Sequence, residues 1–245
     1  MIDDNCIVVT GAASGIGYAV AAHQLKHGSR VVAVDLNADR LAERFAENPS
    51  VKTIACDLTT DGGFKFLTAE IKSVCDRVGG FVHAAGIDVM APLGLVQPSV
   101  MQRLFAIHAV FPVRFLGWMA KKGNHSENAA CVLISSLSAH EGAKGHVAYA
   151  AAKGAVEGLL KPAAAELLDK GIRINEVILG VIETEMSRGW IKKLSPEQQE
   201  SLRHSYPLNL GTPESVADVV AFLLSESARW MTGQKVVCDG GHQLV

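Results

Sequence analysis

The chain alternates short apolar runs with longer helical segments along most of its length. The runs have the length and β-branched content of buried strands and cover residues 6–10, 30–34, 51–56, 81–84, 130–134, 172–178 and 235–238. Helix-like patterns lie between them at 15–27, 37–47, 61–77, 98–121, 148–169 and 213–226. This alternation predicts an α/β fold, a doubly wound parallel sheet of about seven strands with helices on both faces.

Length and patterning favour a single domain over residues 1–245. The 245 residues suffice for one α/β domain with a full core, and the chain has no internal repeat or low-complexity tract. Segment 185–211 interrupts the alternation before the last helix and is too long for a simple connection. We therefore expect it to be a lid over a binding site.

Charge and hydropathy exclude several classes of protein. Lysine and arginine number 23 against 25 acidic residues, a net charge of −2 that gives no electrostatic reason to bind nucleic acid or an acidic membrane. The 49% apolar content excludes a disordered chain. The longest early stretch without a charge, residues 5–25, is too polar to span a membrane, and Asp3 and Asp4 replace the basic start of a signal peptide. We expect a soluble, cytoplasmic protein.

Cysteine and histidine spacing gives no sign of a metal site. The five cysteines are far apart and form no Cys-x-x-Cys, and the nine histidines include no His-Glu-x-x-His. The interpretation we adopt is five buried thiols in a reducing compartment, with no disulfide and no metal.

A glycine-rich turn, TGAASGIG at residues 10–17, joins the first predicted strand to the first helix. Glycines let the backbone turn tightly and let a pyrophosphate approach amides at a helix N-terminus. The alternative is a turn that merely packs the helix on the strand. The candidate cofactor-binding residues in the turn are Gly11, Ser14, Gly15, Ile16 and Gly17.

Asp35 ends the second predicted strand, 18 residues after Gly17. A carboxylate there accepts hydrogen bonds from the adenosine ribose and repels the 2′-phosphate of NADP, by roughly 4 kcal/mol per charge pair at about 4 Å. Arg40 is expected one helical turn into the next helix, and no other basic residue is near to hold a phosphate. The pattern favours NAD over NADP. The alternative is that Asp35 is only a helix N-cap.

Ser136, Tyr149 and Lys153 form a candidate catalytic group. Tyr149 and Lys153 are four residues apart at the start of a predicted helix and share one face, and Ser136 ends the strand before it. A tyrosine can exchange a proton with an alcohol or ketone oxygen if an adjacent ammonium lowers its pKa, while a hydride carrier acts on the carbon. Tyr-x-x-x-Lys alone is common in amphipathic helices, but the glycine turn and Asp35 in the expected order strengthen the assignment.

The order of motifs resembles the classical short-chain dehydrogenase/reductase family over nearly the whole chain. The matching elements are T-G-x-x-x-G-x-G at 10–17, Asp57-Leu58, Ala85-Gly86, Ile134-Ser-Ser136, Tyr149-x-x-x-Lys153, Arg173-x-Asn175, Gly180-x-x-x-Thr184, Thr232-Gly233 and Asp239-Gly-Gly241. The resemblance implies a Rossmann-type fold, a nicotinamide cofactor and a Ser/Tyr/Lys site. The lid and C-terminal third look most like 3-oxoacyl-carrier-protein reductases, a likeness shared by reductases of sugars, polyols and hydroxy acids, so the substrate stays open.

The resemblance also assigns further cofactor contacts. Asp57 and Leu58 would lie against adenine, Ala85 and Gly86 would border the cofactor, and Ile182 and Thr184 would meet the nicotinamide end. Tyr149 and Lys153 would contact the cofactor as well as the substrate. Many members of the family are tetramers paired through two long helices, which here correspond to 98–121 and 148–169, so a tetramer or dimer is expected.

Three positions depart from the family pattern: His83, Leu179 and His108. His108 replaces the asparagine that completes the tetrad, if the helix from 98 aligns without a gap. That asparagine is thought to hold a water linking the lysine to solvent. A histidine could keep this relay running, make it pH-sensitive or break it, or it could be a packed side chain without a role.

Four residues are candidates for contact with substrate. His140 and His146 lie in the loop between Ser136 and Tyr149, where polar groups suit a hydroxylated or charged substrate, although plain surface exposure is an equal alternative. Met186 and Trp190 would form an apolar wall of the lid, or belong to the core.

The leading hypothesis is an NAD(H)-dependent oxidoreductase that interconverts a secondary alcohol and a ketone. An alternative within the enzyme class is an NADPH-dependent 3-oxoacyl-thioester reductase. An alternative from another class is a catalytically silent nicotinamide-binding sensor or scaffold, which the departures at His83, His108 and Leu179 motivate and the retained Ser136, Tyr149 and Lys153 oppose.

Overall fold

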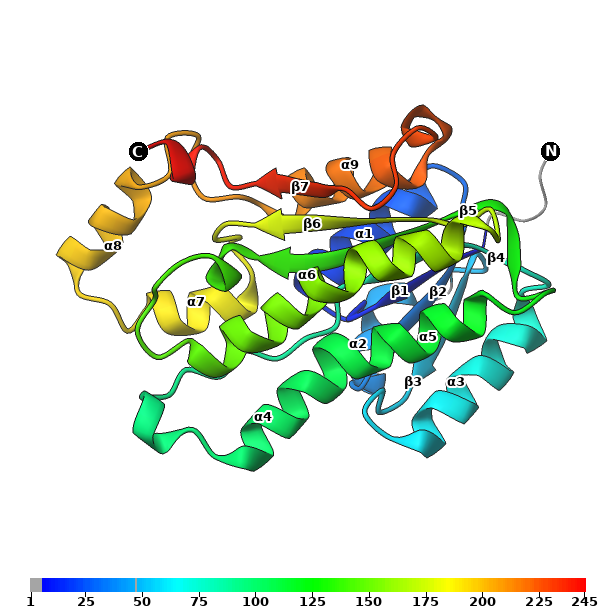
Figure 1. Ribbon diagram of the computed structural model, residues 1–245, viewed down its shortest axis with the longest axis horizontal. Helices are drawn as coiled ribbons and strands as arrows, with labels where there is room; N and C mark the ends of the chain where they lie inside the picture. The colour runs from blue at the N-terminus through cyan, green and yellow to red at the C-terminus, as the bar shows by residue number, and fades with distance from the viewer. Residues whose placement is uncertain (1–5, 47) are drawn as a thin grey trace.

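The computed structural model describes residues 6–46 and 48–245; Asp3, Asp4 and the last residue of the helix predicted over 37–47 lie outside these ranges. A parallel sheet runs through the molecule in the order β3-β2-β1-β4-β5-β6-β7 (Figure 1). Its strands are β1 (Cys6–Thr10), β2 (Arg30–Asp35), β3 (Val51–Ala55), β4 (Val78–His83), β5 (His125–Ser136), β6 (Arg173–Leu179) and β7 (Lys235–Cys238). The predicted doubly wound α/β fold is confirmed.

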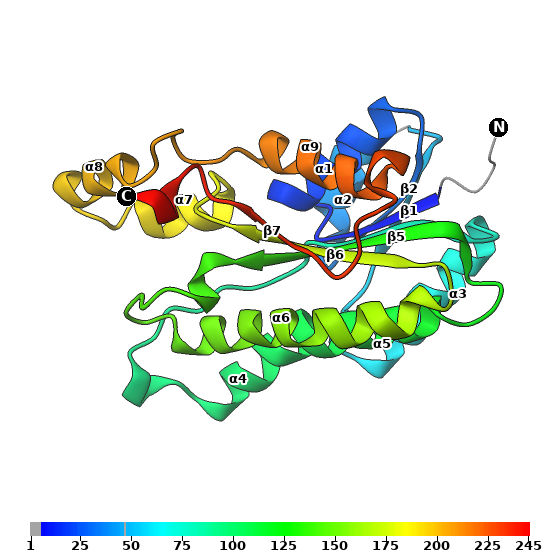
Figure 2. The same cartoon turned by 45° about the horizontal axis from the view of Figure 1, so that its top comes forward.

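Helices cover both faces of the sheet. They are α1 (Gly15–Lys26), α2 (Ala38–Phe45), α3 (Asp61–Val74), α4 (Pro98–Phe105), α5 (Phe111–Met119), α6 (Val147–Leu168), α7 (Glu185–Ile191), α8 (Pro196–His204) and α9 (Pro213–Leu224). Figure 2 shows α1, α2 and α9 on one face and α3, α4, α5 and α6 on the other, with α7 and α8 beyond the end of β6.

Burial on both faces of the sheet explains why the strands appear in the sequence as continuous apolar runs. Every residue of β1 is buried, and its side chains alternate between two hydrophobic clusters, one on each side of the sheet. Aromatic packing fills the cluster under α5, where the rings of Phe81 and Phe115 lie 4.3 Å apart. Removal of these large apolar surfaces from water is the main force that holds the helices on the sheet.

Strand order also fixes where a ligand can bind. β1 lies between β2 and β4, so the chain winds outward in opposite directions from this point. Helices leave the carboxyl ends of β1 and β4 on opposite faces, and a crevice opens between them. The glycine turn after β1 and Ala85-Gly86 after β4 therefore meet at the same edge of the sheet.

The helix predicted over 98–121 is interrupted. A π turn at Ala106–Val110 separates α4 from α5 and contains His108. Pro112, in the first turn of α5, has no N–H to donate to the carbonyl of His108 four residues earlier, which disfavours regular α-helical bonding there.

Segment 185–211, the predicted lid, is largely helical. It forms two helices, α7 and α8, whose starts are fixed by capping boxes at Thr184 and Ser195. The buried Tyr206 anchors the segment, because its hydroxyl accepts a hydrogen bond from the backbone N–H of Val181 at 3.0 Å. This hydrogen bond thus attaches the segment to the chain just beyond the end of β6.

The expectation of five separate thiols is wrong for one pair. Cys6 and Cys75 form a disulfide, with their Cα atoms 6.3 Å apart and a sequence separation of 69 residues. The strand order explains the pairing, because β1 and β4 are neighbours and the α3–β4 connection therefore ends beside the start of β1. Cys56, Cys131 and Cys238 are free thiols.

Two kinds of feature are absent from the part of the chain that the structure describes. In residues 6–46 and 48–245, no helix is long and apolar enough to cross a membrane. The same residues contain no group of three or more His, Cys, Asp or Glu side chains placed to hold a metal ion.

Candidate active site

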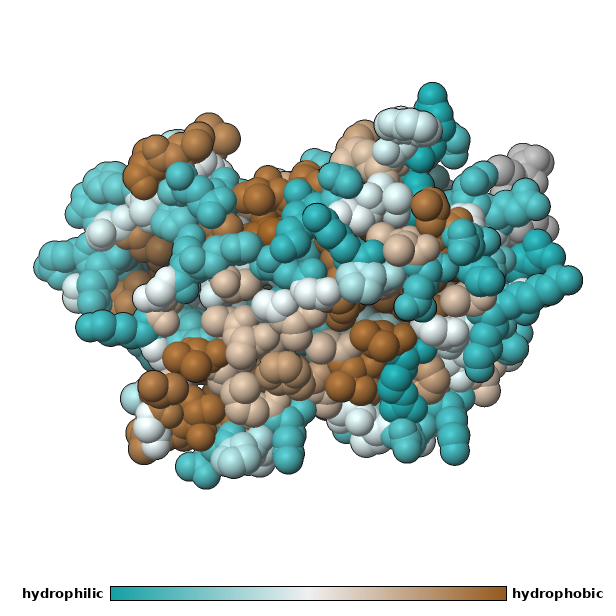
Figure 3. All heavy atoms as spheres, in the orientation of Figure 1, coloured by the Kyte–Doolittle hydropathy of each residue, from teal (hydrophilic) through white to brown (hydrophobic). Residues whose placement is uncertain are grey.

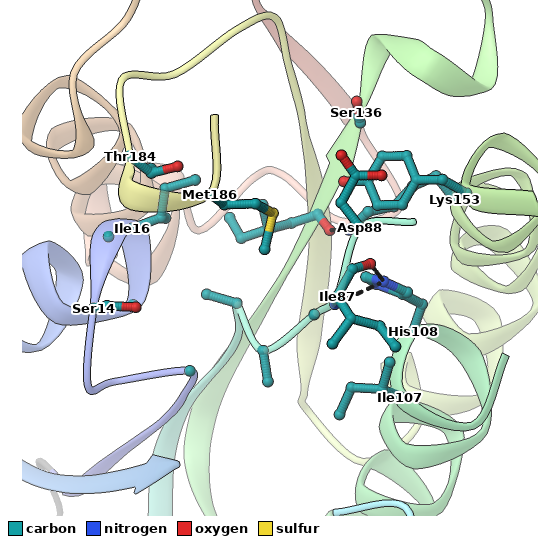
Figure 4. Close-up of a pocket in the computed structure, with 18 of the residues that line it drawn as sticks. Ser14, Ile16, Ile87, Asp88, Ile107, His108, Ser136, Lys153, Thr184 and Met186 are labelled. Atoms are coloured by element: carbon teal, nitrogen blue, oxygen red, sulfur yellow. Dashed lines mark hydrogen bonds between the residues drawn. The ribbon is translucent and has the colours of Figure 1, made fainter. Parts of the chain in front are cut away.

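A cavity of about 550 Å³ opens at the carboxyl edge of the sheet. Figure 4 shows Ser14, Ile16 and Thr184 on one side of it and Ser136, Asp88 and Lys153 on the other. Its volume falls in the range typical of ligand and cofactor sites. The cavity therefore brings the predicted cofactor residues and the predicted catalytic residues together.

The glycine turn lines one side of the cavity. Gly11 has a φ of +70°, and a Cβ there would lie 2.8 Å from the backbone N of Ala85; a Cβ on Gly17 would lie 2.2 Å from the carbonyl oxygen of Gly11. Ser14 is the N-cap of α1, but within the described residues its side chain makes no capping hydrogen bond, and the first turn of α1 has no acidic residue. The amides and positive dipole end of α1 thus suit the pyrophosphate of a dinucleotide.

Asp35 lies at the end of β2 with its carboxylate held in place. Its Oδ2 accepts a hydrogen bond from Ala13 N at 3.1 Å and its Oδ1 accepts one from Asn37 N at 3.0 Å. The N-cap of α2 is Asn37, whose side chain accepts from Arg40 N, so the N-cap alternative for Asp35 does not hold. Asp35 lines the cavity, which agrees with a role in binding the ribose hydroxyls.

The remaining predicted cofactor residues also line this cavity: Gly15, Ile16, Asp57, Leu58, Ala85, Gly86, Ile182 and Thr184. Thr184 is the N-cap of α7, and its methyl group lies 3.2 Å from the position of a Cβ on Gly15, so the lid meets the glycine turn here. This set of cradle residues fits a nicotinamide dinucleotide extended along the carboxyl edge of the sheet.

Ser136, Tyr149 and Lys153 converge on the opposite side of the cavity. Ser136 is the last residue of β5, and Tyr149 and Lys153 occupy successive turns of α6. Lys153 is buried; its ammonium donates a hydrogen bond to the carbonyl of Ile134 at 2.9 Å and lies 5.5 Å from the centre of the Tyr149 ring. Strand β5 and helix α6 therefore place the hydroxyl, phenol and ammonium groups at one site.

Burial controls the protonation of this group. Desolvation raises the pKa of Tyr149, the nearby Asp88 carboxylate raises it further, and the Ser136 hydroxyl acts in the opposite direction. Desolvation also lowers the pKa of Lys153 to about 8, against the charges of Glu176 and Asp88. Tyr149 is thus protonated at neutral pH, ready to donate to a carbonyl oxygen.

His108 is buried against the same site. Its Nε2 lies 2.9 Å from the carbonyl oxygen of Ile87, as Figure 4 shows, and its ring contacts that of Tyr149 edge-on with centres 5.6 Å apart. Burial lowers the pKa of His108 to about 2, assisted by the charge of Lys153. At neutral pH the ring is uncharged, so it does not take up a proton from Lys153 by titration.

His83 is a satisfied core residue. Its Nδ1 lies 2.9 Å from Thr10 Oγ1 and its Nε2 lies 2.9 Å from the carbonyl oxygen of Ile107, so it ties β1, β4 and the π turn together. Burial lowers its pKa to about 3. The third departure, Leu179, is buried at the end of β6 in the cluster beneath α1 and α9.

The four predicted substrate residues divide into two groups. His146, Met186 and Trp190 line the cavity, whereas His140 does not. His140 follows the short turn Leu137–Ala139, and its Nε2 instead lies 2.8 Å from Glu157 Oε1 on α6. Its placement does not support the predicted contact with substrate.

Asp88 and Glu176 are two charged groups that the sequence analysis did not select. Asp88 lines the cavity two residues beyond Gly86, and one of its oxygens is buried without a hydrogen-bond partner among the residues described. Desolvation raises its pKa, while the charges of His146 and Lys153 lower it. Glu176 lies in the middle of β6 and is fully buried. An acid inside an apolar strand was the signal that could have revealed it.

Comparison with known proteins agrees with this geometry. A family model described as Enoyl-(Acyl carrier protein) reductase matches residues 11–243, nearly the whole chain. Together with the pocket and its motifs, the match decides the family. The chain is a short-chain dehydrogenase/reductase. Members of this family are NAD(P)-dependent oxidoreductases that act on CH–OH groups, and this chain is one of them.

Two relatives of this short-chain dehydrogenase/reductase cover its full length. One is 2-(R)-hydroxypropyl-CoM dehydrogenase of Xanthobacter autotrophicus, 32% identical over 97% of this chain and 98% of the relative. The other is the 3-oxoacyl-[acyl-carrier-protein] reductase FabG of Thermotoga maritima, 31% identical over 98% of each. Among solved structures, 4-hydroxyisoleucine dehydrogenase complexed with NADH superimposes with a TM-score of 0.90 at 25% identity, over 98% of this chain and 99% of the other.

Proposed function

We propose that this dehydrogenase interconverts a secondary alcohol and a ketone with NAD(H), using Tyr149 as acid and base. The observation that carries the proposal is the convergence of Ser136, Tyr149 and Lys153 on the same cavity as the glycine turn and Asp35. A hydride carrier and a proton carrier must both reach one C–O group, and this cavity places the groups for each on opposite sides.

In oxidation, Tyr149 as phenolate takes the hydroxyl proton, while Ser136 orients the substrate oxygen. Lys153 stabilises the phenolate through its ammonium and holds the ribose next to the nicotinamide. The bound nicotinamide supplies the acceptor or donor of the hydride. In reduction, Tyr149 returns its proton to the carbonyl oxygen, and the raised pKa of the buried phenol keeps that proton in place beforehand.

Asp35 supports NAD over NADP. Its carboxylate is fixed by two backbone amides at the edge of the cavity, where it would repel a 2′-phosphate. Arg40 is the nearby cation that could offset this repulsion, but its guanidinium is paired with Glu185 of the lid at 2.7 Å. A relative's NADH complex, that of 4-hydroxyisoleucine dehydrogenase, is consistent with this preference.

The substrate enters beneath segment 185–211, which we take as the lid of a single catalytic domain. Met186 and Trp190 would form its apolar wall, and His146 with Asp88 would supply polar contacts. Such a lining suits a small hydroxylated or charged molecule, and the names of the two dehydrogenase relatives, 2-(R)-hydroxypropyl-CoM and 4-hydroxyisoleucine, describe substrates with a secondary hydroxyl. The similarity to FabG supports a second candidate, reduction of a 3-oxoacyl thioester with NADPH.

A homodimer or tetramer is part of the proposal. Figure 3 shows small and apolar residues over the face formed by α4, α5 and α6. Val110 in the π turn, Val113 on α5 and Val147 at the start of α6 are each about half exposed. Pairing of subunits through these helices is also what the family resemblance implies, and it supports the proposal.

A turnover assay tests the proposed function. Secondary alcohols, polyols, keto sugars and 3-oxoacyl thioesters would be offered with NAD(H) and NADP(H) in parallel, with nicotinamide absorbance as the readout. Turnover of a secondary alcohol or its ketone with NAD(H) supports the proposal. Preference for NADPH and thioesters selects the second candidate. NADH binding without turnover across the panel would support the sensor or scaffold hypothesis.

A further inference from the structure

Beneath helix α6 lies a buried acidic group that the proposed reaction does not use. Glu176 has no exposed surface, and neither of its carboxylate oxygens has a hydrogen-bond partner in the described part of the chain. A buried carboxylate without partners is costly, and such groups persist mainly where they serve a function. Its position relative to Lys153 indicates what that function is.

Sheet register places Glu176 beneath the catalytic helix. Glu176 pairs with Leu133 on β5 and Lys235 on β7, and parallel partners project to the same face of a sheet. Leu133 belongs to the hydrophobic cluster that α6 covers, so Glu176 points toward α6. Lys153 and Glu157, four residues apart on α6, share one face of that helix. The charges of Lys153 and Glu176 act on each other.

Glu157 on α6 is a second acidic group near Glu176, and the charges of the two carboxylates interact. Glu157 has a side chain only 9% exposed, and it holds His140 Nε2 at 2.8 Å and Lys235 Nζ at 2.5 Å. His140 and Lys235 are 42% and 37% exposed. Glu157 therefore connects the α6 face that carries Lys153 with side chains that reach solvent.

Every element packed around Glu176 contributes to its protonation. Desolvation raises its pKa to about 7, and Glu157 on α6 acts in the same direction. Ser135 on β5, Lys235 on β7 and Lys153 on α6 lower it. A carboxyl poised near neutral pH can both take up and release a proton, as a relay requires.

We propose that Glu176 and Glu157 conduct the reaction's proton between Lys153 and solvent, with His140 at the exit. The proposal rests on the proposed function. In oxidation, Lys153 gives a proton to the Glu176 carboxylate and then, as an amine, accepts the proton that Tyr149 took from the alcohol. Glu176 passes its proton to Glu157, which passes it through His140 to water. Each turnover releases one proton and restores every group; reduction runs the sequence in reverse.

The relay compensates for His108. The family's asparagine at that place is thought to hold a water that connects the lysine to solvent, whereas His108 is uncharged and its Nε2 is engaged by the backbone of Ile87. Glu176 lies within the sheet, on β6. The proposed relay thus replaces a route past the π turn at His108 with one beneath α6.

Steady-state kinetics of Glu176→Gln, Glu157→Gln and the control Glu166→Gln test the relay. Glu166 is an exposed residue of the same helix. We expect kcat in Glu176→Gln to fall at least about tenfold with KM nearly unchanged, and the ionisation near the pKa of Glu176 to leave the kcat–pH profile. The solvent deuterium isotope effect should rise, and Glu176→Asp should restore part of the rate.

The outcomes separate the relay from the reaction on which it depends. Thermal unfolding and NADH binding establish that each variant is folded. If the wild-type protein turns over and Glu176→Gln has the same rate and the same pH profile, the relay is overturned and the proposed function is not. Absence of any Tyr149-dependent turnover in the wild-type protein overturns the proposed function and the relay with it.

Discussion

Arg40 on α2 is ion-paired with Glu185 on α7, with Arg40 Nη2 and Glu185 Oε1 2.7 Å apart. The pair connects the adenosine end of the cavity with the first turn of the lid, and the carboxylate raises the pKa of Arg40 through this hydrogen bond. Both side chains are partly exposed, so the pair contributes little to stability. The pair engages the guanidinium of Arg40, whose charge also interacts with that of Asp35.

Cofactor choice should respond to Asp35. Replacement of Asp35 by Ser removes a charged acceptor for the ribose, and we expect kcat/KM with NAD to fall at least about tenfold while that with NADP rises. Adding Glu185→Gln should free Arg40 for the 2′-phosphate and shift the ratio by a further few-fold. Parallel kinetics with both cofactors measure this, and Asp39→Asn on the exposed side of α2 is the control. An unaltered NAD to NADP ratio in both variants would contradict the role given to Asp35.

The pH dependence of the free energy of unfolding should reveal the ionisation of the buried Glu176. Its folded pKa of about 7 exceeds the ordinary 4.5, so the folded state binds a proton more tightly than the unfolded chain and loses stability as pH rises from 4.5 to 7. The difference corresponds to at most about 3 kcal/mol. Glu176→Gln should therefore unfold several degrees higher than wild type at pH 8 and no higher at pH 4. Equal unfolding temperatures of the variant and wild type at both pH values would show that folding does not raise the pKa of Glu176.

His108 should not titrate during catalysis. With its pKa held near 2 by burial, the ring stays neutral throughout the working range, so His108→Asn should leave the shape of the kcat–pH profile intact. The variant loses packing against Gly86 and Tyr149 and should be less stable by about 1 to 3 kcal/mol. The exposed His204→Asn is the matched control. Loss of an ionisation near pH 6 in His108→Asn alone would show instead that His108 carries charge.

Asp88 opposes ionisation of Tyr149. Its carboxylate raises the pKa of the phenol, so Asp88→Asn should lower that pKa. In a plot of the oxidation rate against pH, the limb that reflects ionisation of Tyr149 should therefore move to lower pH. The position of the limb, rather than the rate, is the appropriate readout, because Asp88 also lines the cavity. Asp169→Asn at the far end of α6 serves as the control. A limb that stays in place would mean that Asp88 is protonated when Tyr149 ionises.

Much of this fold can be predicted from local patterns in the sequence. The buried strands appear as β-branched runs because each is covered on both faces, and the glycine turn follows from close backbone approach at Gly11 and Gly17. Ser136, Tyr149 and Lys153 could be grouped because strand ends and one helix face are predictable.

The features that were missed depend on tertiary neighbours. The Cys6–Cys75 disulfide requires knowing that β1 lies beside β4. The direction of His140 depends on Glu157, a contact across the α6 face rather than within its own loop. Glu176 was visible as one acid in an apolar strand, but only the register of β5, β6 and β7 shows that it faces Lys153.

The role of Tyr149 as acid and base is tested by comparing the turnover of wild type and Tyr149→Phe on the best substrate. NADH absorbance is the readout. The change removes one hydroxyl and leaves the ring, so NADH binding, measured by fluorescence, should persist while kcat falls by about 10² or more. Turnover in Tyr149→Phe at the wild-type rate would contradict the assignment of Tyr149 as the acid and base.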